Sequence, residues 1–412
     1  MGTRPGRSCP SEAWRVSDSY LNLLRAPGVA RVMASQLVAR FPTGMLALGI
    51  LIHIETVFGS YGAAGVVLAA MSVGQALAGP VTSRMMGRFG ARRVLVVTTV
   101  LCAGSMAVVA LAPMQLWGFV VFALLTGLSS PPVQPAVRTI YPRLVDVGKL
   151  PRLFSLDASA QEIIWVAGPL VITVVSREIS PVVGLLVCVA VTLAGGAWFI
   201  TSKELGTVRI ARSETRLGAV LLKPGVMLAT VTGLLLIGAG AAVEVGVVAR
   251  FGEGGLQAGV VLALAAVASL AGGLTLGHLP LTDWTLTRRL AVVAVGTFLA
   301  IYVSGVWWTG LAMVVFGFGI APALAVMYTM VSDSTDFSES AEAYGWIGTG
   351  QLVGAAVGSA IAGFMIDANG PAGGFAVAAV VAALAVVAAA LLRHARPKRT
   401  GADLLADAVS EG

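Results

Sequence analysis

The sequence predicts an all-α membrane protein whose twelve transmembrane helices fall into two groups of six. The first observation is composition: 57% of the 412 residues are hydrophobic and 11% are charged, whereas soluble domains have about 45–50% apolar and about 25% charged residues. The mean hydropathy is +0.89. The second observation is a series of apolar stretches about 20 residues long, which is the length that crosses about 30 Å of hydrocarbon. The third is a polar segment that divides these stretches equally.

The apolar stretches predict the twelve helices in order. They cover residues 30–53, 61–83, 93–113, 115–140, 153–176, 181–201, 225–249, 255–278, 290–306, 308–331, 341–366 and 371–392. The boundary between the ninth and tenth is the least defined, because only SGVWWTG interrupts a long apolar run. The first 27 residues hold no short apolar core ahead of a small-residue cleavage site. We therefore expect no removable signal peptide and take the first helix as the insertion signal.

The positions of lysine and arginine predict the orientation. All but three of the 27 basic residues fall in the two tails, in the loops that follow even-numbered helices, or at the helix ends beside them. The exceptions are Arg40, inside the first helix, and Arg177 and Arg250 on the other side. The positive-inside rule then makes both termini cytoplasmic in a multi-pass protein of the cytoplasmic (inner) membrane. Because topology accounts for the basic residues, we expect no nucleic-acid partner.

Residues 202–223 form the longest internal polar segment, and they separate the helices six and six. The two halves show weak similarity: QPAVRTIYPRL (134–144) aligns with APALAVMYTMV (321–331), pairing Tyr141 with Tyr328. Asp157 then aligns with Glu342 after a short gap, which is typical of a duplicated six-helix unit. The expected organisation is an N-terminal tail (1–27), a first six-helix unit (28–201), a central loop (202–223), a second unit (224–393) and a C-terminal tail (394–412).

The loop after the second helix, SRMMGRFGARRVL (83–95), resembles the corresponding loop of the major facilitator superfamily (MFS). Arg88, Gly90, Arg92 and Arg93 match the pattern, while Gly87 stands where an Asp is usual. The loop between the eighth and ninth helices, LTDWTLTRRL, carries a degenerate second copy of this pattern. The resemblance covers residues 28–393 and is to twelve-helix bacterial members. It implies two six-helix bundles around a central cavity, which rock to expose that cavity to either side in turn.

The four matching residues of this loop are expected to act as a gating latch. Arginines beside a helix end can bond the exposed carbonyls of a neighbouring helix and complement its negative terminus, which holds one conformation. The alternative is that Arg88, Arg92 and Arg93 only determine topology.

Two further patterns concern helix packing. Small residues at four-residue spacing in the eleventh helix (Gly350, Gly354, Gly358, Ala362) and in the second (Ala70, Gly74, Ala78) favour close approach. The resemblance implies that these two helices face each other between the halves; ordinary static packing is the alternative. Pro131-Pro132 and Gly168-Pro169 should kink or break the fourth and fifth helices.

Polar residues in the apolar stretches are the candidates for substrate binding and coupling. Arg40 and Glu162 lie at the same depth, about 15 Å from the cytoplasmic ends of their helices. We expect them to pair, because a lone charge there costs at least ~2.5–3.5 kcal/mol. The expected substrate and coupling set is Arg40, Glu162, Asp157, Gln161, Gln36, Trp165, Tyr344 and Gln351. For Asp157 the alternatives are solvation or pairing with Arg138, Arg143 or Arg152, and for the others they are structural packing.

Near the outer surface, Glu244 is expected either to form an outer gate with Arg250 or to contact substrate. If transport is coupled to protons, Glu162 is the expected coupling group, since its protonation would respond to wetting of the cavity. The three histidines are scattered and the cysteines have no metal spacing, so we expect no metal site.

These observations favour a secondary active transporter and not an enzyme. There is no phosphate-binding loop ending in Lys-Ser or Lys-Thr, and no cluster of nucleophile and base. The resemblance suggests efflux of a small organic molecule, with import of a nutrient or metabolite as the alternative and a non-transporting sensor as a third. Drug–proton antiporters of this superfamily carry an arginine in the fourth helix and additional glycines in the fifth. Here residues 115–137 contain no arginine, and Ile172 and Thr173 stand where the glycines are expected. The resemblance therefore argues against drug–proton antiport. We expect a monomer that contacts substrate and lipid, with no cofactor beyond a proton gradient.

Overall fold

The computed structural model describes residues 20–207, 216–251 and 256–393, and this part of the chain is almost entirely helical. It contains twelve helical spans long and apolar enough to cross a membrane, which confirms the predicted fold class. Both predicted tails lie largely outside the described residues, as does part of the central loop. The short α9 (Lys203–Thr207) and a 3₁₀ turn, η3 (Ala219–Leu222), belong to the described part of that loop.

The observed helices match the predicted stretches within a few residues at most ends. In the first half they are α2 (Val29–Phe58), α3 (Tyr61–Phe89), α4 (Ala91–Leu111), α5 (Leu116–Leu128) with α6 (Val133–Ile140), α7 (Leu150–Glu178) and α8 (Pro181–Ile200). In the second half they are α10 (Pro224–Phe251), α11 (Leu256–Leu276), α12 (Thr285–Tyr302), α13 (Val306–Ser334), α14 (Phe337–Asn369) and α15 (Pro371–Leu391).

Local chemistry sets several helix ends. Gly59 ends α2 with a φ of +62°, which favours glycine. The Ser60 hydroxyl then accepts the Ala63 amide at 3.2 Å and starts α3. Ser180 accepts the Val183 amide at 3.1 Å in the same way at the start of α8.

The two proline pairs behave differently. Pro131 and Pro132 lie outside helical structure and divide the fourth span into α5 and α6, as predicted. At Gly168-Pro169, by contrast, α7 continues without interruption. Gly168 lies directly against the backbone of Gly44 on α2, so this glycine serves close helix packing.

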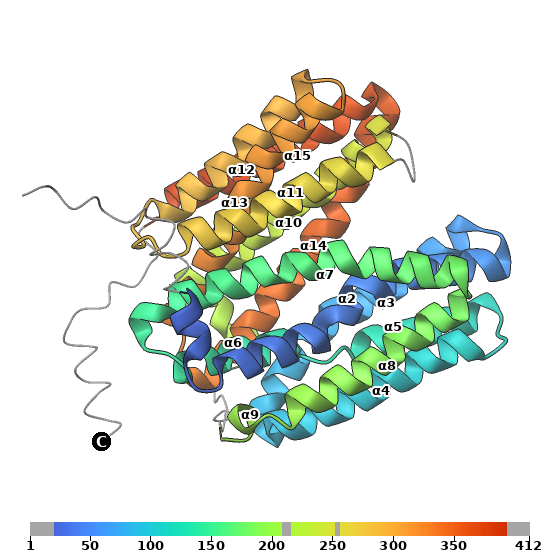
Figure 1. Cartoon of the computed structure of the whole chain (residues 1–412), viewed down its shortest axis with the longest axis horizontal. Coiled ribbons are helices and arrows are strands. Elements are labelled where there is room, and N and C mark those ends of the chain that lie inside the picture. The colour runs from blue at the N-terminus through green and yellow to red at the C-terminus, as the bar shows by residue number, and fades with distance from the viewer. Residues whose placement is uncertain (1–19, 208–215, 252–255, 394–412) are drawn as a thin grey trace, which may run out of the picture.

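The helices form two bundles, with α2 to α8 in one and α10 to α15 in the other (Figure 1). The bundles meet mainly through α7 with α11 and α13, and through α14 with α3 and α6. At one end, which we call the terminal end, lie the start of α2, the described central loop and the end of α15. The ribbons of the two bundles diverge toward the opposite, distal end (Figure 1).

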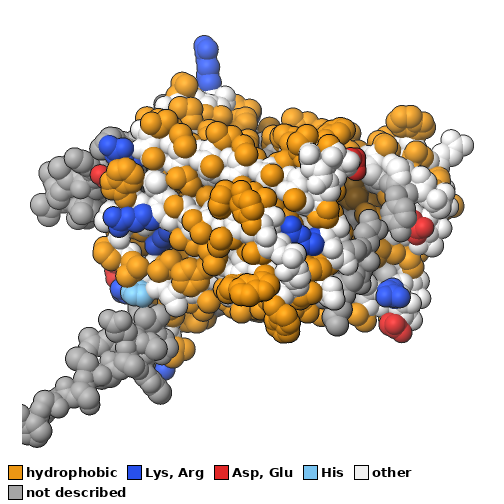
Figure 2. All heavy atoms as spheres, turned by 90° about the horizontal axis from the view of Figure 1, so that it is seen from above, with side chains coloured by type: hydrophobic (Ala, Val, Ile, Leu, Met, Phe, Trp, Pro, Cys, Tyr) orange, Lys and Arg blue, Asp and Glu red, His pale blue; other side chains and the backbone are white. Residues whose placement is uncertain are grey.

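Hydrophobic side chains cover most of the face drawn in Figure 2. Large apolar side chains such as Leu77, Val97 and Leu170 are more than half exposed. Soluble proteins rarely expose continuous apolar surface of this kind, whereas lipid chains cover it in a membrane. The chain is therefore a multi-pass membrane protein.

Candidate functional site

A buried carboxylate on α7 is the centre of a polar network in the first bundle. The side chain of Asp157 is fully buried. Its Oδ1 accepts hydrogen bonds from Gln36 Nε2 at 3.1 Å, from an Arg40 guanidinium nitrogen at 3.1 Å and from the Tyr141 hydroxyl at 3.2 Å. Its Oδ2 accepts from Arg138 Nε at 3.0 Å. We call these five residues, together with Gln161, the Asp157 network.

The network joins the predicted polar faces of two helices. The Arg40 nitrogen that contacts Asp157 also donates to Gln36 Oε1 at 2.8 Å, and the other terminal nitrogen donates to Gln161 Oε1. Each helix contributes two side chains spaced four residues apart, which places them on one face. The structure therefore brings these four candidate residues together, while their role in substrate binding stays a prediction.

Arg138 extends the network to the second bundle. Its guanidinium carbon lies 3.3 Å from the centre of the Tyr328 ring on α13. Tyr328 in turn accepts a hydrogen bond from the Tyr344 hydroxyl at its carbonyl oxygen, at 3.0 Å, and from Gln351 Nε2 at its own hydroxyl, at 3.4 Å. The rings of Tyr328 and Tyr344 both lie within 6.3 Å of the Phe154 ring. Two more predicted residues, on α14, thus reach the network through one tyrosine.

Only indirect signals in the sequence point to Arg138 and Tyr328. Arg138 is one of three basic residues that could pair with Asp157 by position, and Tyr328 is the repeat counterpart of Tyr141. Both tyrosines pack on Phe154, at ring distances of 5.7 and 6.3 Å. Tyr141 and Tyr328 occupy equivalent positions in the two halves, and both lie at the boundary between the bundles. The repeat alignment is the sequence signal for this shared position.

Glu162 does not pair with Arg40, so that prediction is wrong. Glu162 Oε1 accepts a hydrogen bond from Ser269 Oγ on α11 at 2.8 Å, and the same Oγ accepts the Ala321 amide at 3.2 Å. Glu162 follows Asp157 by five residues, which turns its side chain about 140° around α7. Arg40 therefore meets Asp157, and Glu162 links the first bundle to the second.

Trp165 lies apart from these residues. Its side chain is 52% exposed at the surface of α7, although it follows Glu162 by three residues. The structure does not bring it into the Asp157 network.

The terminal end of the boundary is closed by residues that approach α11. The Tyr20 hydroxyl, from the segment before α2, donates to the Gly273 carbonyl oxygen at 3.3 Å. Ser155 Oγ on α7 donates to the same oxygen at 2.6 Å. A side chain at Gly277 would collide with both hydroxyls. The glycines of α11 thus allow two donors from the first bundle to reach its backbone.

An ion pair closes the other side of the terminal end. Arg84 on α3 lies 3.0 Å from Glu342 Oε2 on α14, and Glu342 Oε1 accepts the Gly218 amide of the central loop at 2.7 Å. About two turns further along α14, Thr349 Oγ1 donates to the Ala76 carbonyl on α3 at 2.8 Å. The two bundles and the chain between them therefore meet at Glu342.

The predicted latch residues lie at the end of α3 and the start of α4. Arg92 Nε donates to the Ile200 carbonyl at 3.1 Å, which is the expected bond between an arginine and a helix end. The helix concerned is α8, however, in the same bundle. Gly90 makes the turn between α3 and α4 with a φ of +88°, and Arg88 and Arg93 are exposed. A gating role for these four residues stays a prediction.

Comparison with protein families identifies this arrangement. The family model described as Major Facilitator Superfamily matches residues 32–289 and 281–409. The chain belongs to the Major Facilitator Superfamily. It is accordingly a membrane transporter of the twelve-helix type. None of the curated proteins compared with the chain matches it.

Solved structures of other transporters share the fold. A bacterial homologue of the iron transporter ferroportin in an outward-facing state has a TM-score of 0.72 at 13% identity, covering 88% of this chain and 98% of that one. The E. coli fucose:proton symporter FucP has a TM-score of 0.70 at 14% identity, covering 90% and 98%. The human organic anion transporter MFSD10 has a TM-score of 0.63 at 16% identity, covering 92% and 100%. At these identities the likeness concerns the fold alone.

The small-residue stripes of this MFS protein pack inside its bundles, and not between them as predicted. Gly354 and Gly358 on α14 lie against the backbone of α10, and Gly74 on α3 lies against α5. The expected approach of α3 to α14 does occur, but nearer the terminal end, where Gly79 and Gly345 meet. Helices that touch along their whole length need small residues at each turn, whereas α3 and α14 meet at one end only.

Of the two roles expected for Glu244, the gate contact with Arg250 is not formed among the described residues, and contact with substrate stays a prediction. An Arg250 guanidinium nitrogen donates to the carbonyls of Ala300 and Val303 at 2.9 Å each, and the guanidinium lies 4.2 Å from the Phe375 ring centre. Arg250 therefore holds the end of α12 within the second bundle, because the free carbonyls there attract a cation. Glu244 is exposed on α10.

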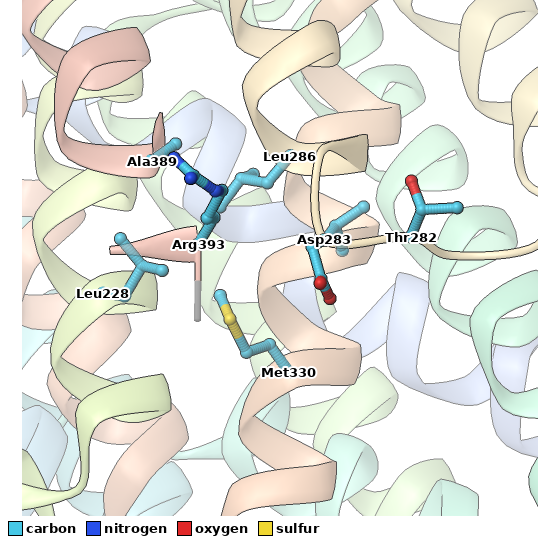
Figure 3. A pocket seen from close by; sticks show the side chains of 8 residues that line it. Leu228, Thr282, Asp283, Leu286, Met330, Ala389 and Arg393 are labelled. Atoms are coloured by element: carbon cyan, nitrogen blue, oxygen red, sulfur yellow. The ribbon is translucent and has the colours of Figure 1, made fainter. Parts of the chain in front are cut away.

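A small hollow, open to solvent, lies at the terminal end of the second bundle (Figure 3). It is lined by Leu228, Thr282, Asp283, Leu286, Val326, Met330, Ala389 and Arg393. All of these belong to α10, α12, α13, α15 or their ends. The hollow is thus separate from the Asp157 network of the transporter.

Proposed function

We propose that this MFS protein is a secondary active transporter that moves a small organic molecule across the cytoplasmic membrane by alternating access, in the direction of export. The observation that supports alternating access is the one-sided closure of the boundary between the bundles, while the direction of export rests on the resemblance to bacterial MFS members. Polar bonds through Tyr20, Arg84 and Ser155 join the bundles at the terminal end, and the bundles diverge at the distal end (Figure 1). With cytoplasmic termini, the end at which these bonds join the bundles faces the cytoplasm.

The free-energy cost of opening the terminal end, so that the distal end can close instead, is modest. The contacts at the terminal end are a few hydrogen bonds, an ion pair and close glycine packing, and each is worth about 1 kcal/mol. A bound substrate that favours the other state by a few kcal/mol would therefore shift the population. Import by the same cycle is the second candidate, and a test must read both directions.

Glu162 is the residue that we propose couples this cycle to protons. As a carboxylate it accepts a charge-assisted bond from Ser269 across the bundle boundary, and such bonds are roughly twice as strong as neutral ones. Protonation weakens that bond, which favours separation of α7 from α11. Glu162 would take up a proton from one side of the membrane while α7 and α11 are in contact. It would release the proton to the opposite side once the two helices have separated.

Proteoliposomes loaded with the pH dye pyranine test both parts. A library of small organic compounds is added to either side, and transport of a coupled substrate moves protons and changes the dye signal. For each active compound, Glu162→Gln should abolish proton movement and gradient-driven accumulation but leave counterflow exchange largely intact, because shape is kept and charge removed. Glu178→Gln, an exposed acid at the end of α7, is the matched control.

Two results would count against the proposal. If no compound crosses the membrane through the protein in either direction, secondary transport is wrong. If Glu162→Gln accumulates substrate as the unmutated protein does, Glu162 is a packing residue and the coupling group lies elsewhere.

A further inference from the structure

We infer that the transported molecule carries one anionic group, such as a carboxylate, and that this group binds at Arg40. The inference rests on the proposed function and names its substrate class.

The network has one more positive charge than negative charges. Arg40 and Arg138 both pair with the single carboxylate of Asp157, and an arginine side chain keeps its charge inside proteins. The other members are neutral amides and a phenol. In the part of the chain that the structure describes, no second carboxylate forms an ion pair with either guanidinium, and Glu162 is directed to α11. A binding site of this charge favours a monovalent anion.

The two guanidinium groups differ in what they can offer to a ligand. Arg138 is 1% exposed, bonds Asp157 through Nε and is covered on one face by the Tyr328 ring. Arg40 is 6% exposed and bonds Asp157 with one terminal nitrogen, and among the described residues its other terminal nitrogen donates only to the neutral amide oxygen of Gln161. An anionic oxygen makes a stronger bond with a guanidinium than an amide does. An anion can therefore replace Gln161 at Arg40 without disturbing Asp157.

The face of α2 that carries the buried Arg40 continues toward the distal end with small, exposed residues. Thr43 and Ala47, one and two turns further along this face, are exposed. Phe41 and Leu48, which are half-buried, lie roughly a third of a turn away around the helix. The exposed side of Thr43 and Ala47 is thus distinct from the side with large apolar residues. Along this face only a hydroxyl and a methyl group lie between Arg40 and the distal end, and we take this as the path by which a small molecule reaches Arg40.

The test measures binding first and transport second. Purified full-length protein in detergent is heated with a panel of small organic acids, each paired with its amide and its amine. We expect the compounds that raise the melting temperature to be acids, with no shift from their neutral and cationic partners. The apparent Kd of such an acid should rise at least about tenfold in Arg40→Gln, which is about 1.4 kcal/mol or more. Arg177→Gln, at an exposed arginine near the end of α7, should bind as the unmutated protein does.

Arg40→Lys decides the question if Arg40→Gln does not fold. Lysine keeps the charge but loses the planar pair of donors, so the acid should still bind, with an apparent Kd raised about threefold to tenfold. The inference is overturned if the stabilising compounds are all neutral or cationic, if no acid in the panel binds, or if the Arg40 variants bind the acid as tightly as the unmutated protein.

Counterflow in proteoliposomes separates this inference from the proposed function. Exchange of neutral or cationic compounds alone would leave the transporter in place and reject the anionic substrate. An acid that binds at Arg40 but does not cross the membrane would support the site and reject transport.

Discussion

Asp157 is the residue on which the polar interior of the first bundle depends. Both buried guanidiniums, an amide and a phenol donate to it. A carboxylate so surrounded balances charge and also fixes the positions of α2, α6 and α7. Its removal leaves two buried cations without a counter-charge, which is more costly than the loss of its hydrogen bonds alone.

Asp157→Asn should therefore destabilise the protein by about 3–5 kcal/mol, the range found when one partner of a buried ion pair is removed. The measurement is the melting temperature of the purified protein in detergent. Asp146→Asn removes the same charge at an exposed position paired with Lys149 and should leave the melting temperature unchanged. Equal melting temperatures for both variants would show that the network is solvated and not structural.

The helices of this protein are of two kinds: those held along their length and those that meet at one end. The α10–α14 pair belongs to the first kind, since a Cβ atom at Gly354 or Gly358 would collide with the backbone of α10. The α3–α14 pair belongs to the second. Only the second kind can separate while each bundle stays intact.

Gly354→Ala tests this distinction. The added methyl group has no space, so we expect a loss of about 1–3 kcal/mol in stability, as for overpacking of a core. Gly348→Ala, on the same helix, meets no atom within 4 Å and should be neutral or slightly stabilising. Thermal unfolding of the two variants provides the measurement, and comparable losses would contradict the packing described.

Helix number and limits were predictable, because length and apolarity are properties of each segment alone. The same holds for the break at Pro131-Pro132, which removes backbone donors locally. Partner choice was less predictable: Arg40 and Glu162 share a depth, but pairing depends on the rotation of α7, and a difference of about 140° separates Glu162 from Asp157. The small-residue stripes likewise predict close packing of the second and eleventh helices, but they do not identify the helix that packs against each stripe.

At the scale of the whole molecule, the structure is asymmetric between its two ends. The bundles touch at the terminal end and diverge at the distal end (Figure 1). Which end faces the cytoplasm decides whether this state takes molecules from outside or from inside. Basic residues predict that the terminal end is cytoplasmic.

Single cysteines at Leu222 and Ser304 test that orientation. Leu222 is 81% exposed in the central loop, and Ser304 is exposed between α12 and α13 at the other end. In a background with Cys9→Ser, a membrane-impermeant maleimide added to intact cells should label Ser304→Cys and not Leu222→Cys. The two remaining native cysteines, Cys102 and Cys188, are buried. The reverse pattern would invert the orientation, and labelling of both would refute the twelve-span topology.

The bond between Tyr20 and Gly273 also sets an order of events during biosynthesis. Its two residues are 253 positions apart, so at about 5–20 residues per second Tyr20 waits roughly 10–50 s before its acceptor has been made. The Arg138–Asp157 pair spans only 19 positions and can form while the first bundle is still emerging. The nascent chain thus carries a completed charged interior, still uncovered by Tyr328, before the second bundle exists to close it. Inserting α13 is then the step that shields Arg138, and chains truncated before it should be targets for membrane quality control.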